Sequence, residues 1–361
     1  MKFLLIGFFG RTYMPYMKEY EKILQEENIS YDVTCFERYE TAPIEITAKR
    51  LGTEYTYKQK TTAKPTSKIL PAFGYFRFVK KLIRRNRYDR LIVFTTMPAI
   101  FLSPLLVFKY KKRYIYDYRD YTYEKYLWFR LAAKWVMDRA VFVCFSSKGY
   151  LKYYPGLKNY LITHNISNQD KCIHTAPNLK EKKKLCIGFL GYVRYFDVNK
   201  KIIDALANSP HFSLKYVGSS FSDCDLQSYC TSLKIENVEF LGTYLNEEKP
   251  RLYQDIDIIN SVYSLESPEV KQAVPNRIYD AALFKKPILV AKGTYLSRMV
   301  EKYDLGISID PAKDEILQSI SAYICSFDSE EFTKKCNGFL FDVSRDLKIF
   351  HERIAAFIRG E

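Results

Sequence analysis

The pattern of apolar residues predicts short buried strands that alternate with amphipathic helices. Residues 2–6 (KFLLI) form an almost unbroken apolar run, residues 15–27 carry apolar side chains at helical spacing, and a second predicted strand, YDVTCF, follows at residues 31–36. Runs of this length are typical of parallel strands whose two faces are both covered. The chain therefore opens as a β-α-β unit.

The same pattern starts again in the second half. A polar, lysine-rich segment at residues 168–184 comes first, and residues 184–191 (KLCIGFLG) then form a new strand before a helix at residues 202–209. Alternating strands and helices predict an α/β fold with doubly wound parallel sheets. A chain of 361 residues is long enough for two cores. We therefore expect one domain at residues 1–170 and a second at residues 180–340.

Two segments depart from this pattern. Residues 40–70 are polar, rich in Thr and Lys and without a clear period, which predicts an extended loop with little defined structure. Residues 91–108 carry no charge and approach the lower length limit of a membrane-spanning helix. Pro98, Pro104 and the β-rich start LIVF divide this second segment into a strand, a turn and a short buried helix. We predict no transmembrane segment.

The basic charge of the chain is confined to its first half. Residues 1–178 contain 31 Lys and Arg against 15 Asp and Glu, whereas residues 179–361 contain 25 against 26. A basic half suggests an anionic partner, which is a membrane surface, a phosphorylated acceptor or a nucleic acid. Residues 73–90 place cations on one side of a predicted helix and apolar residues on the other. This helix packs on a core, lies on anionic lipid, or does both.

The spacing of cysteine and histidine does not favour a metal site. The eight cysteines form no CxxC pair, and the four histidines are scattered. This pattern is typical of reduced cytosolic thiols that serve as small core residues. We expect no metal and no other resident cofactor.

A candidate anion site lies in the block of residues 274–310. Asn276 belongs to a loop that opens a helix at residues 278–284, and a short apolar strand follows at residues 287–291. A second helix then begins near Thr294. The free N–H groups and the dipole at such a helix start favour an anion such as a diphosphate.

This block, with Asp280 in its first helix and the phrase KKPILVAKGTY after it, resembles the nucleotide-sugar site of GT-B glycosyltransferases, especially the retaining family 4 type. The resemblance implies two Rossmann-like doubly wound domains that face a cleft. The first domain would bind the acceptor and the second the nucleotide-sugar donor. The resemblance also implies that the terminal helix, residues 341–361, packs back on the first domain.

Family 4 enzymes carry two glutamates eight positions apart, one near the donor sugar and one that accepts hydrogen bonds from the ribose hydroxyls. Gln272 and Asp280 occupy these positions here, and aspartate keeps the carboxylate with a shorter reach. Glu266 or Glu269 is the alternative to Gln272. Asn276 and Arg277 stand where related sequences have a polar and a basic residue near the phosphates. Arg277 is alternatively a cation on a helix surface.

A second set of donor residues follows the strand that ends in Gly191. Arg194 and Lys200 match, by resemblance, the Arg and Lys that hold the donor diphosphate in family 4 enzymes. Two cations and a helix N-terminus stabilise a departing nucleoside diphosphate without a metal ion. The aspartate pairs at 223 and 225 and at 255 and 257 superficially offer a DxD metal motif. In the resembling chains such carboxylates cap helices and strands instead.

The first half has its own candidates. Gly10 lies in a turn after the first predicted strand, and in GT-B enzymes this loop faces the cleft. Asp117, Arg119 and Asp120 cluster at a predicted strand end, where residues that activate an acceptor can sit. We take these three as candidate catalytic residues. An ion-paired cap of the strand is the alternative.

The resemblance and the basic first half together predict a glycosyltransferase. It would move a sugar from a nucleotide donor to a membrane lipid-linked saccharide in the assembly of a bacterial capsule, O-antigen or exopolysaccharide, with retention and without metal. We expect it in the cytoplasm, bound peripherally to the inner face of the membrane. Two other classes stay open: a nucleotide-sugar epimerase of similar fold, and a basic nucleic-acid-binding protein, for which no RNP, KH or helix-turn-helix pattern is visible.

Overall fold

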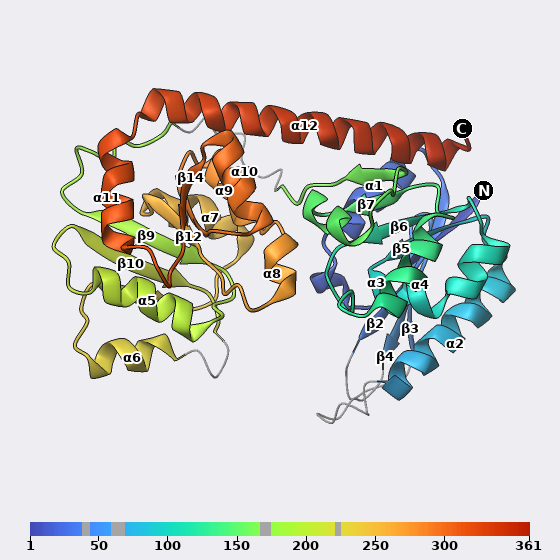
Figure 1. The fold of residues 1–361 in the computed structure, drawn as a ribbon. Coiled ribbons are helices and arrows are strands. Elements are labelled where there is room, and N and C mark those ends of the chain that lie inside the picture. Colours follow the sequence, from blue (N-terminus) through green and yellow to red (C-terminus); the bar gives the residue numbers. More distant parts are fainter. Residues whose placement is uncertain (38–43, 59–68, 167–174, 221–224) are drawn as a thin grey trace. The chain divides into compact units, whose positions relative to one another are not determined.

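The computed structural model describes residues 1–37, 44–58, 69–166, 175–220 and 225–361. The chain forms two compact units, and each is built on a mainly parallel sheet that helices cover (Figure 1). Unit 1 comprises Met1–His164 and Arg345–Glu361, and unit 2 comprises Asn165–Ser344. Residues 168–174 of the predicted lysine-rich linker lie outside the described residues.

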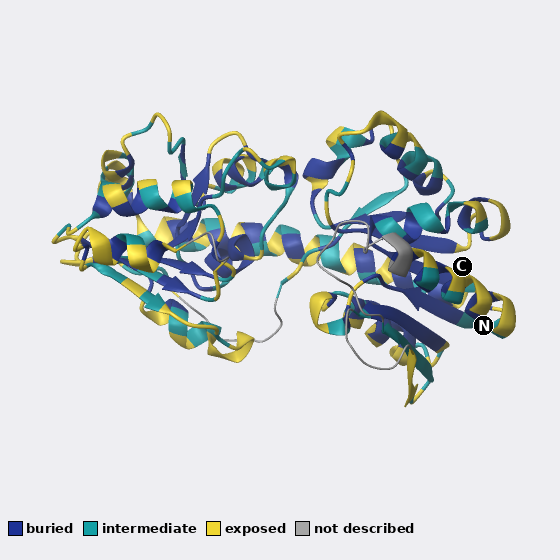
Figure 2. Cartoon of the chain, turned by 90° about the horizontal axis from the view of Figure 1, so that it is seen from below, coloured by how far each residue is buried: buried dark blue, intermediate teal, exposed yellow. Residues whose placement is uncertain are grey.

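The sheet of unit 1 has the strand order β3-β4-β2-β1-β5-β6-β7-β8. Every neighbouring pair is parallel except β3 and β4, which are antiparallel at one edge. Central strands such as β1 are apolar on both faces because helices cover both. Figure 2 shows that many strand residues are buried. The strands are β1 (Lys2–Ile6), β2 (Ser30–Glu37), β3 (Ile44–Lys49), β4 (Gly52–Lys58), β5 (Arg90–Phe94), β6 (Tyr114–Tyr118), β7 (Val143–Phe145) and β8 (Tyr160–Ile162).

Two helical layers cover this sheet. On one face, α1 (Met17–Glu26) and the end of α12 (Ser329–Arg359) pack together, and Tyr20, Phe350 and Phe357 join the core that Phe3 also enters. The other face carries α2 (Ile69–Asn86), α3 (Thr96–Phe101) and α4 (Leu127–Met137). The strand order requires this division, because right-handed crossovers from β1 to β2 and from β4 to β5 run in opposite directions.

Unit 2 has a fully parallel sheet in the order β11-β10-β9-β12-β13-β14. Its strands are β9 (Leu185–Leu190), β10 (Phe212–Val217), β11 (Val238–Leu241), β12 (Ile258–Ser261), β13 (Ile288–Ala291) and β14 (Gly306–Ile309). Its helices, besides the start of α12, are α5 (Phe196–Leu206), α6 (Leu226–Ser232), α7 (Lys249–Gln254), α8 (Pro268–Gln272), α9 (Arg277–Leu283), α10 (Tyr295–Tyr303) and α11 (Ile316–Ser326).

The prediction of an extended loop at residues 40–70 is wrong for residues 44–58, which form the hairpin of β3 and β4. Residues 40–43 and 59–68 lie outside the described residues. As the sheet edge, β3 buries no residue, so its sequence lacks the apolar run of an inner strand. The antiparallel pairing of β3 with β4 holds the hairpin together. Ion pairs such as Lys58–Glu45 at 2.5 Å add to it, and Tyr57 packs on Phe36 of β2.

The uncharged segment at residues 91–108 is divided and begins with the predicted strand, but two helical segments follow where a turn and one short helix were predicted. It forms β5, then α3, and then a π-helical turn at Leu105–Lys109. Among the described residues, no helix is both long enough and apolar enough to cross a bilayer.

Candidate functional site

The strand order of unit 2 reverses between β9 and β12. From β9 the chain proceeds outward to β10 and β11, and from β12 it proceeds the other way to β13 and β14. In doubly wound sheets, ligands bind beyond the carboxyl ends of the strands at such a switch point. The residues that follow β9 and β12 therefore define where a ligand site is expected in this unit.

Arg277, the first residue of α9, lies at this switch point. Its Nε donates to the carbonyl oxygen of Leu190 at 2.7 Å, and its Nη1 donates to the hydroxyl of Tyr263, just beyond β12. The guanidinium carbon is 3.7 Å from the centroid of the Phe189 ring, and only 6% of the residue is exposed. Arg277 is thus a fixed cation that joins the ends of β9 and β12, and the alternative of a surface cation is wrong.

Gly191 makes room for this arginine. Its φ of +124° favours glycine, and a Cβ at this position would lie 2.9 Å from Nη2 of Arg277. On its other side, Gly191 contacts Gly218 so closely that a Cβ on Gly218 would meet the carbonyl oxygen of Gly191 at 2.1 Å. The ends of β9 and β10 can approach each other here because Gly218 has no side chain, whereas the missing side chain of Gly191 leaves room for Arg277.

Asp280 lies one turn after Arg277 on α9 and is 5% exposed. Its carboxylate accepts hydrogen bonds from the Lys249 ammonium at 3.1 Å and from the Tyr253 hydroxyl at 2.9 Å. Burial raises the pKa of Tyr244 nearby, and Asp280 adds to this effect while Arg277 opposes it. The sequence contained no sign of Lys249 as a partner, because the two residues are 31 positions apart.

The other predicted residues of this block occupy the ends of short helices. The Thr294 hydroxyl caps α10, since it accepts from the Ser297 amide at 2.9 Å and donates to the Ala291 carbonyl at 3.0 Å. Asn276 precedes α9 and is exposed, whereas Gln272 ends α8 and is 5% exposed. An anion at this helix start would therefore meet backbone N–H groups of α10, because the Thr294 hydroxyl is already engaged in two hydrogen bonds.

Arg194 and Lys200 differ in their surroundings. Arg194 is exposed beyond β9, with its guanidinium 5.5 Å from the ring centroid of Tyr192. Lys200 pairs with Asp204 at 2.7 Å, which raises the lysine pKa. The first turn of α5 lies between them, and its buried Asn199 donates through its side-chain amide to the Arg194 carbonyl at 2.7 Å. The Lys200 ammonium thus lies along α5 and contacts Asp204, one turn later on the same helix.

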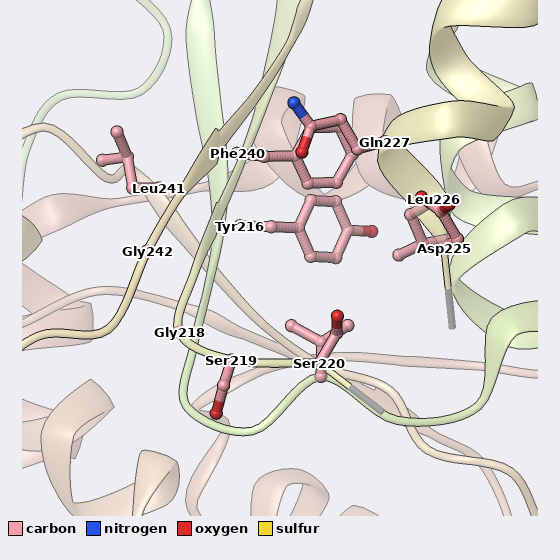
Figure 3. A pocket seen from close by; sticks show the side chains of 11 residues that line it. Tyr216, Gly218, Ser219, Ser220, Asp225, Leu226, Gln227, Phe240, Leu241 and Gly242 are labelled. Carbon is pink, nitrogen blue, oxygen red and sulfur yellow. The ribbon is translucent and has the colours of Figure 1, made fainter. Parts of the chain in front are cut away.

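A cavity of about 270 Å³ opens at the carboxyl ends of β10 and β11. The rings of Tyr216 and Phe240 stack with centroids 5.5 Å apart on one side, and residues of α6 lie opposite (Figure 3). Because Gly218 both lines the cavity and contacts Gly191, the cavity adjoins the switch point. Its lining residues are Val193, Tyr216, Gly218, Ser219, Ser220, Asp225, Leu226, Gln227, Phe240, Leu241 and Gly242.

The candidates of unit 1 separate into buried and exposed groups. Asp117 is fully buried and accepts from both Arg119, with Nη2 at 2.7 Å, and the Tyr20 hydroxyl. Arg119 is 5% exposed and lies 4.2 Å from the ring centroid of Tyr16. This geometry favours the ion-paired strand cap for Asp117 and Arg119. Asp120 is exposed, and partial desolvation raises its pKa while Arg119 opposes the shift.

Gly10 and the described aspartates Asp225 and Asp257 make contacts that stabilise the fold. A Cβ on Gly10 would lie 2.9 Å from Oε1 of Glu37, so this turn packs against the end of β2. Asp225 caps α6 through the Ser228 amide, and Asp257 accepts from the Cys186 amide at 2.9 Å. Asp223 lies outside the described residues. Within the part of the chain that the structure describes, no three His, Cys, Asp or Glu side chains converge as a metal site requires.

No family model matches the chain, and no curated protein matches its sequence. A sucrose-phosphate synthase from Thermosynechococcus elongatus matches with a TM-score of 0.67 at 13% identity, over 99% of this chain and 100% of that one. Anabaena HepE in complex with UDP matches with a TM-score of 0.67 at 16% identity, over 99% and 100%. WaaG, a glycosyltransferase involved in lipopolysaccharide biosynthesis, matches with a TM-score of 0.63 at 13% identity, over 100% of both chains. Likeness at such identities establishes a common architecture, and this chain has the GT-B fold, with two Rossmann-like α/β units.

Proposed function

We propose that this protein is a glycosyltransferase that takes a sugar from a nucleotide-sugar donor. The observation that carries the proposal is the fixed guanidinium of Arg277 at the switch point of unit 2, one helical turn from the Asp280 carboxylate. A cation at this point suits a diphosphate, and a carboxylate beside it suits the hydroxyl groups of a ribose. HepE, which shares the fold, binds UDP and UDP-glucose.

The reaction requires that the negative charge of the departing nucleoside diphosphate be stabilised. Arg277 would supply this from a position that two hydrogen bonds hold in advance, and the exposed Arg194 and the start of α10 would add to it. The adjoining cavity, with the stacked rings of Tyr216 and Phe240 at one side, would take the base of the nucleotide.

We further propose that the acceptor is a saccharide on a membrane lipid and that the product belongs to a bacterial capsule, O-antigen or exopolysaccharide. The support is the basic first half of the chain, together with the resemblance of residues 188–310 to family 4 enzymes. Transfer would retain the anomeric configuration and need no metal. The leaving phosphate would assist the attacking hydroxyl, so an enzyme nucleophile is unnecessary. Peripheral binding to the inner membrane face is part of the same proposal.

Nucleotide binding by the wild type tests the donor site. We would measure melting temperature and calorimetric affinity with UDP, UDP-glucose and GDP-mannose, each with magnesium and with a chelator. Arg277→Gln should lose the ligand-induced stabilisation, while Arg298→Gln, which removes an exposed arginine on α10, should keep it. No stabilisation of the wild type by any nucleotide would contradict the proposal. Release of free nucleotide without an acceptor, with the sugar isomerised, would indicate an epimerase instead.

A further inference from the structure

The outward face of α4 is apolar. Leu127, Trp128 and Leu131 are 61%, 64% and 60% exposed, although each belongs to a helix that already buries its other side against the sheet. At 100° per residue these three positions and Trp135 fall within one arc, opposite the buried Phe129. A surface helix normally turns polar residues outward, so this face is built to contact something apolar.

Two further aromatic residues extend this face. Phe108, on the π-helical turn, is 76% exposed and meets the ring of Trp135 edge-on at 5.7 Å. Tyr126 is 45% exposed and stacks on Trp128 at 6.5 Å. We call the set of Phe108, Tyr126, Leu127, Trp128, Leu131 and Trp135 the α4 patch. Single exposed apolar residues are common, but a contiguous group of this size marks an interaction surface.

Cations surround the α4 patch. Lys109 and Lys111 follow Phe108 and are exposed, while Lys125 lies 4.9 Å from the Tyr126 ring centroid and Arg139 lies 5.4 Å from that of Trp135. The acidic Asp138 on this side is paired with Lys134 at 2.9 Å. Over residues 69–139 the sequence holds 16 Lys and Arg against 5 Asp and Glu. The partner that covers the patch must therefore be apolar in the middle and anionic around it.

Helix α2 adds mainly charge, although Phe73 is 52% exposed and meets the Phe101 ring edge-on. Its apolar side is used in the core, where Tyr75, Phe76 and Val79 are buried. Its outward side is basic, and α2 and α4 flank α3 on the same face of the sheet, with Phe76 stacked on Phe101 of α3. The exposed cations of this side are Arg77, Lys80, Lys81, Arg84, Arg85 and Arg87.

We propose that the α4 patch inserts into the surface of a bilayer rich in anionic lipid, with the cations of α2 and of residues 109–113 on the headgroups. Trp and Tyr suit this boundary because one end of each ring system is apolar and the other polar. A second copy of the chain fits the patch poorly, since a symmetric contact would set the basic rim of one patch against the equally basic rim of the other. The inference rests on the proposed function, because binding to the bilayer would give the enzyme access to a lipid-linked acceptor.

The two tryptophans of the chain, Trp128 and Trp135, both belong to the α4 patch, so intrinsic fluorescence reports directly on it. We would mix the full chain with vesicles of phosphatidylcholine alone or with phosphatidylglycerol, and with brominated lipid. We expect a blue shift, and quenching by bromine, with the anionic vesicles only. Emission that anionic vesicles leave unchanged would overturn the proposal. So would a blue shift that depends on protein concentration without vesicles, which would indicate a second copy.

Matched variants locate the surface by co-sedimentation with the same vesicles. Phe108→Ser with Leu131→Ser should lower binding by at least about tenfold, and Lys109→Gln with Lys111→Gln by about fivefold per lysine at low salt. Phe341→Ser, at a residue 69% exposed on α12 in unit 2, and Lys313→Gln should bind as the wild type does. Equal loss in both sets would contradict the proposal.

UDP-induced stabilisation is measured on the same variants. Variants that lose vesicle binding but are still stabilised by UDP would show that the α4 patch and the nucleotide site are separate surfaces. If UDP does not stabilise the wild type but the wild type still binds anionic vesicles, the proposed function is contradicted and the membrane proposal is not.

Discussion

The ammonium nitrogen of Lys249 lies 3.1 Å from a carboxylate oxygen of Asp280, and the Tyr253 hydroxyl donates to the same oxygen. The carboxylate proposed to bind the donor ribose is therefore already held in place by two donors from α7. A carboxylate offers about four acceptor positions, so a ribose can share it with these two partners. The partners fix the orientation of Asp280 in advance of any ligand.

This arrangement predicts different effects for the two members of the pair. Asp280→Asn should weaken nucleotide binding by about tenfold or more, because hydrogen bonds to a charged group are lost. Lys249→Gln should change it by less than about threefold, since the carboxylate remains. Calorimetric titration with UDP measures both, and Asp304→Asn, at an exposed aspartate of unit 2, is the control. An equal loss in both variants would indicate that Lys249 itself contacts the donor.

Gly191→Ala should destabilise unit 2 by about 1–3 kcal/mol, because the new Cβ meets Arg277 and alanine is strained at a φ of +124°. Gly242 also follows a parallel strand of this sheet, but a Cβ there meets nothing within 4 Å. Gly242→Ala should therefore change stability by no more than about 0.5 kcal/mol. Urea unfolding compares the two variants. Similar values for both would show that Arg277 moves aside without cost.

The candidate catalytic residues of unit 1 can be told apart by stability. Asp117→Asn should cost about 3–5 kcal/mol, because it leaves the buried Arg119 without its counter-charge. Asp120→Asn should leave the unfolding free energy near that of the wild type, since Asp120 is exposed. If Asp120 activates the acceptor, sugar transfer falls by a factor of about 10². Full transfer activity in Asp120→Asn would exclude the residue from catalysis.

His164 should make unit 1 less stable in mild acid. Burial lowers its pKa, and the Asp346 carboxylate at 3.2 Å opposes this only in part. The unfolded chain has the ordinary value of about 6.5, so below this pH the unfolded state binds the proton more readily. Stability therefore falls as the pH drops from about 6.5 toward the folded-state pKa and levels off below it.

His164→Gln should remove this part of the pH dependence, which urea unfolding at about pH 7.5 and 5.5 would measure. His211→Gln, at an exposed histidine in unit 2, serves as the control. A wild-type slope retained in His164→Gln would assign the pH dependence to another group.

Much of the order of strands and helices could be predicted from the sequence alone. The block at residues 274–310 forms a loop, a helix, a strand and a second helix as expected, in α9, β13 and α10. Strands buried on both faces leave long apolar runs, and helices leave a period near 3.6, so both are visible locally. The edge hairpin of β3 and β4 was missed because exposed strands leave no such run.

The partners of the site residues were decided only by the tertiary structure. Arg277 meets Leu190, which is 87 positions away, because the strand order places the end of β9 beside that of β12. The apolar residues of α4 and α2 look alike in sequence, yet α2 turns its apolar side to the core and α4 exposes Trp128 and Leu131. Periodicity identifies a face of a helix, but only packing determines which face the sheet covers, since that depends on neighbours distant in the chain.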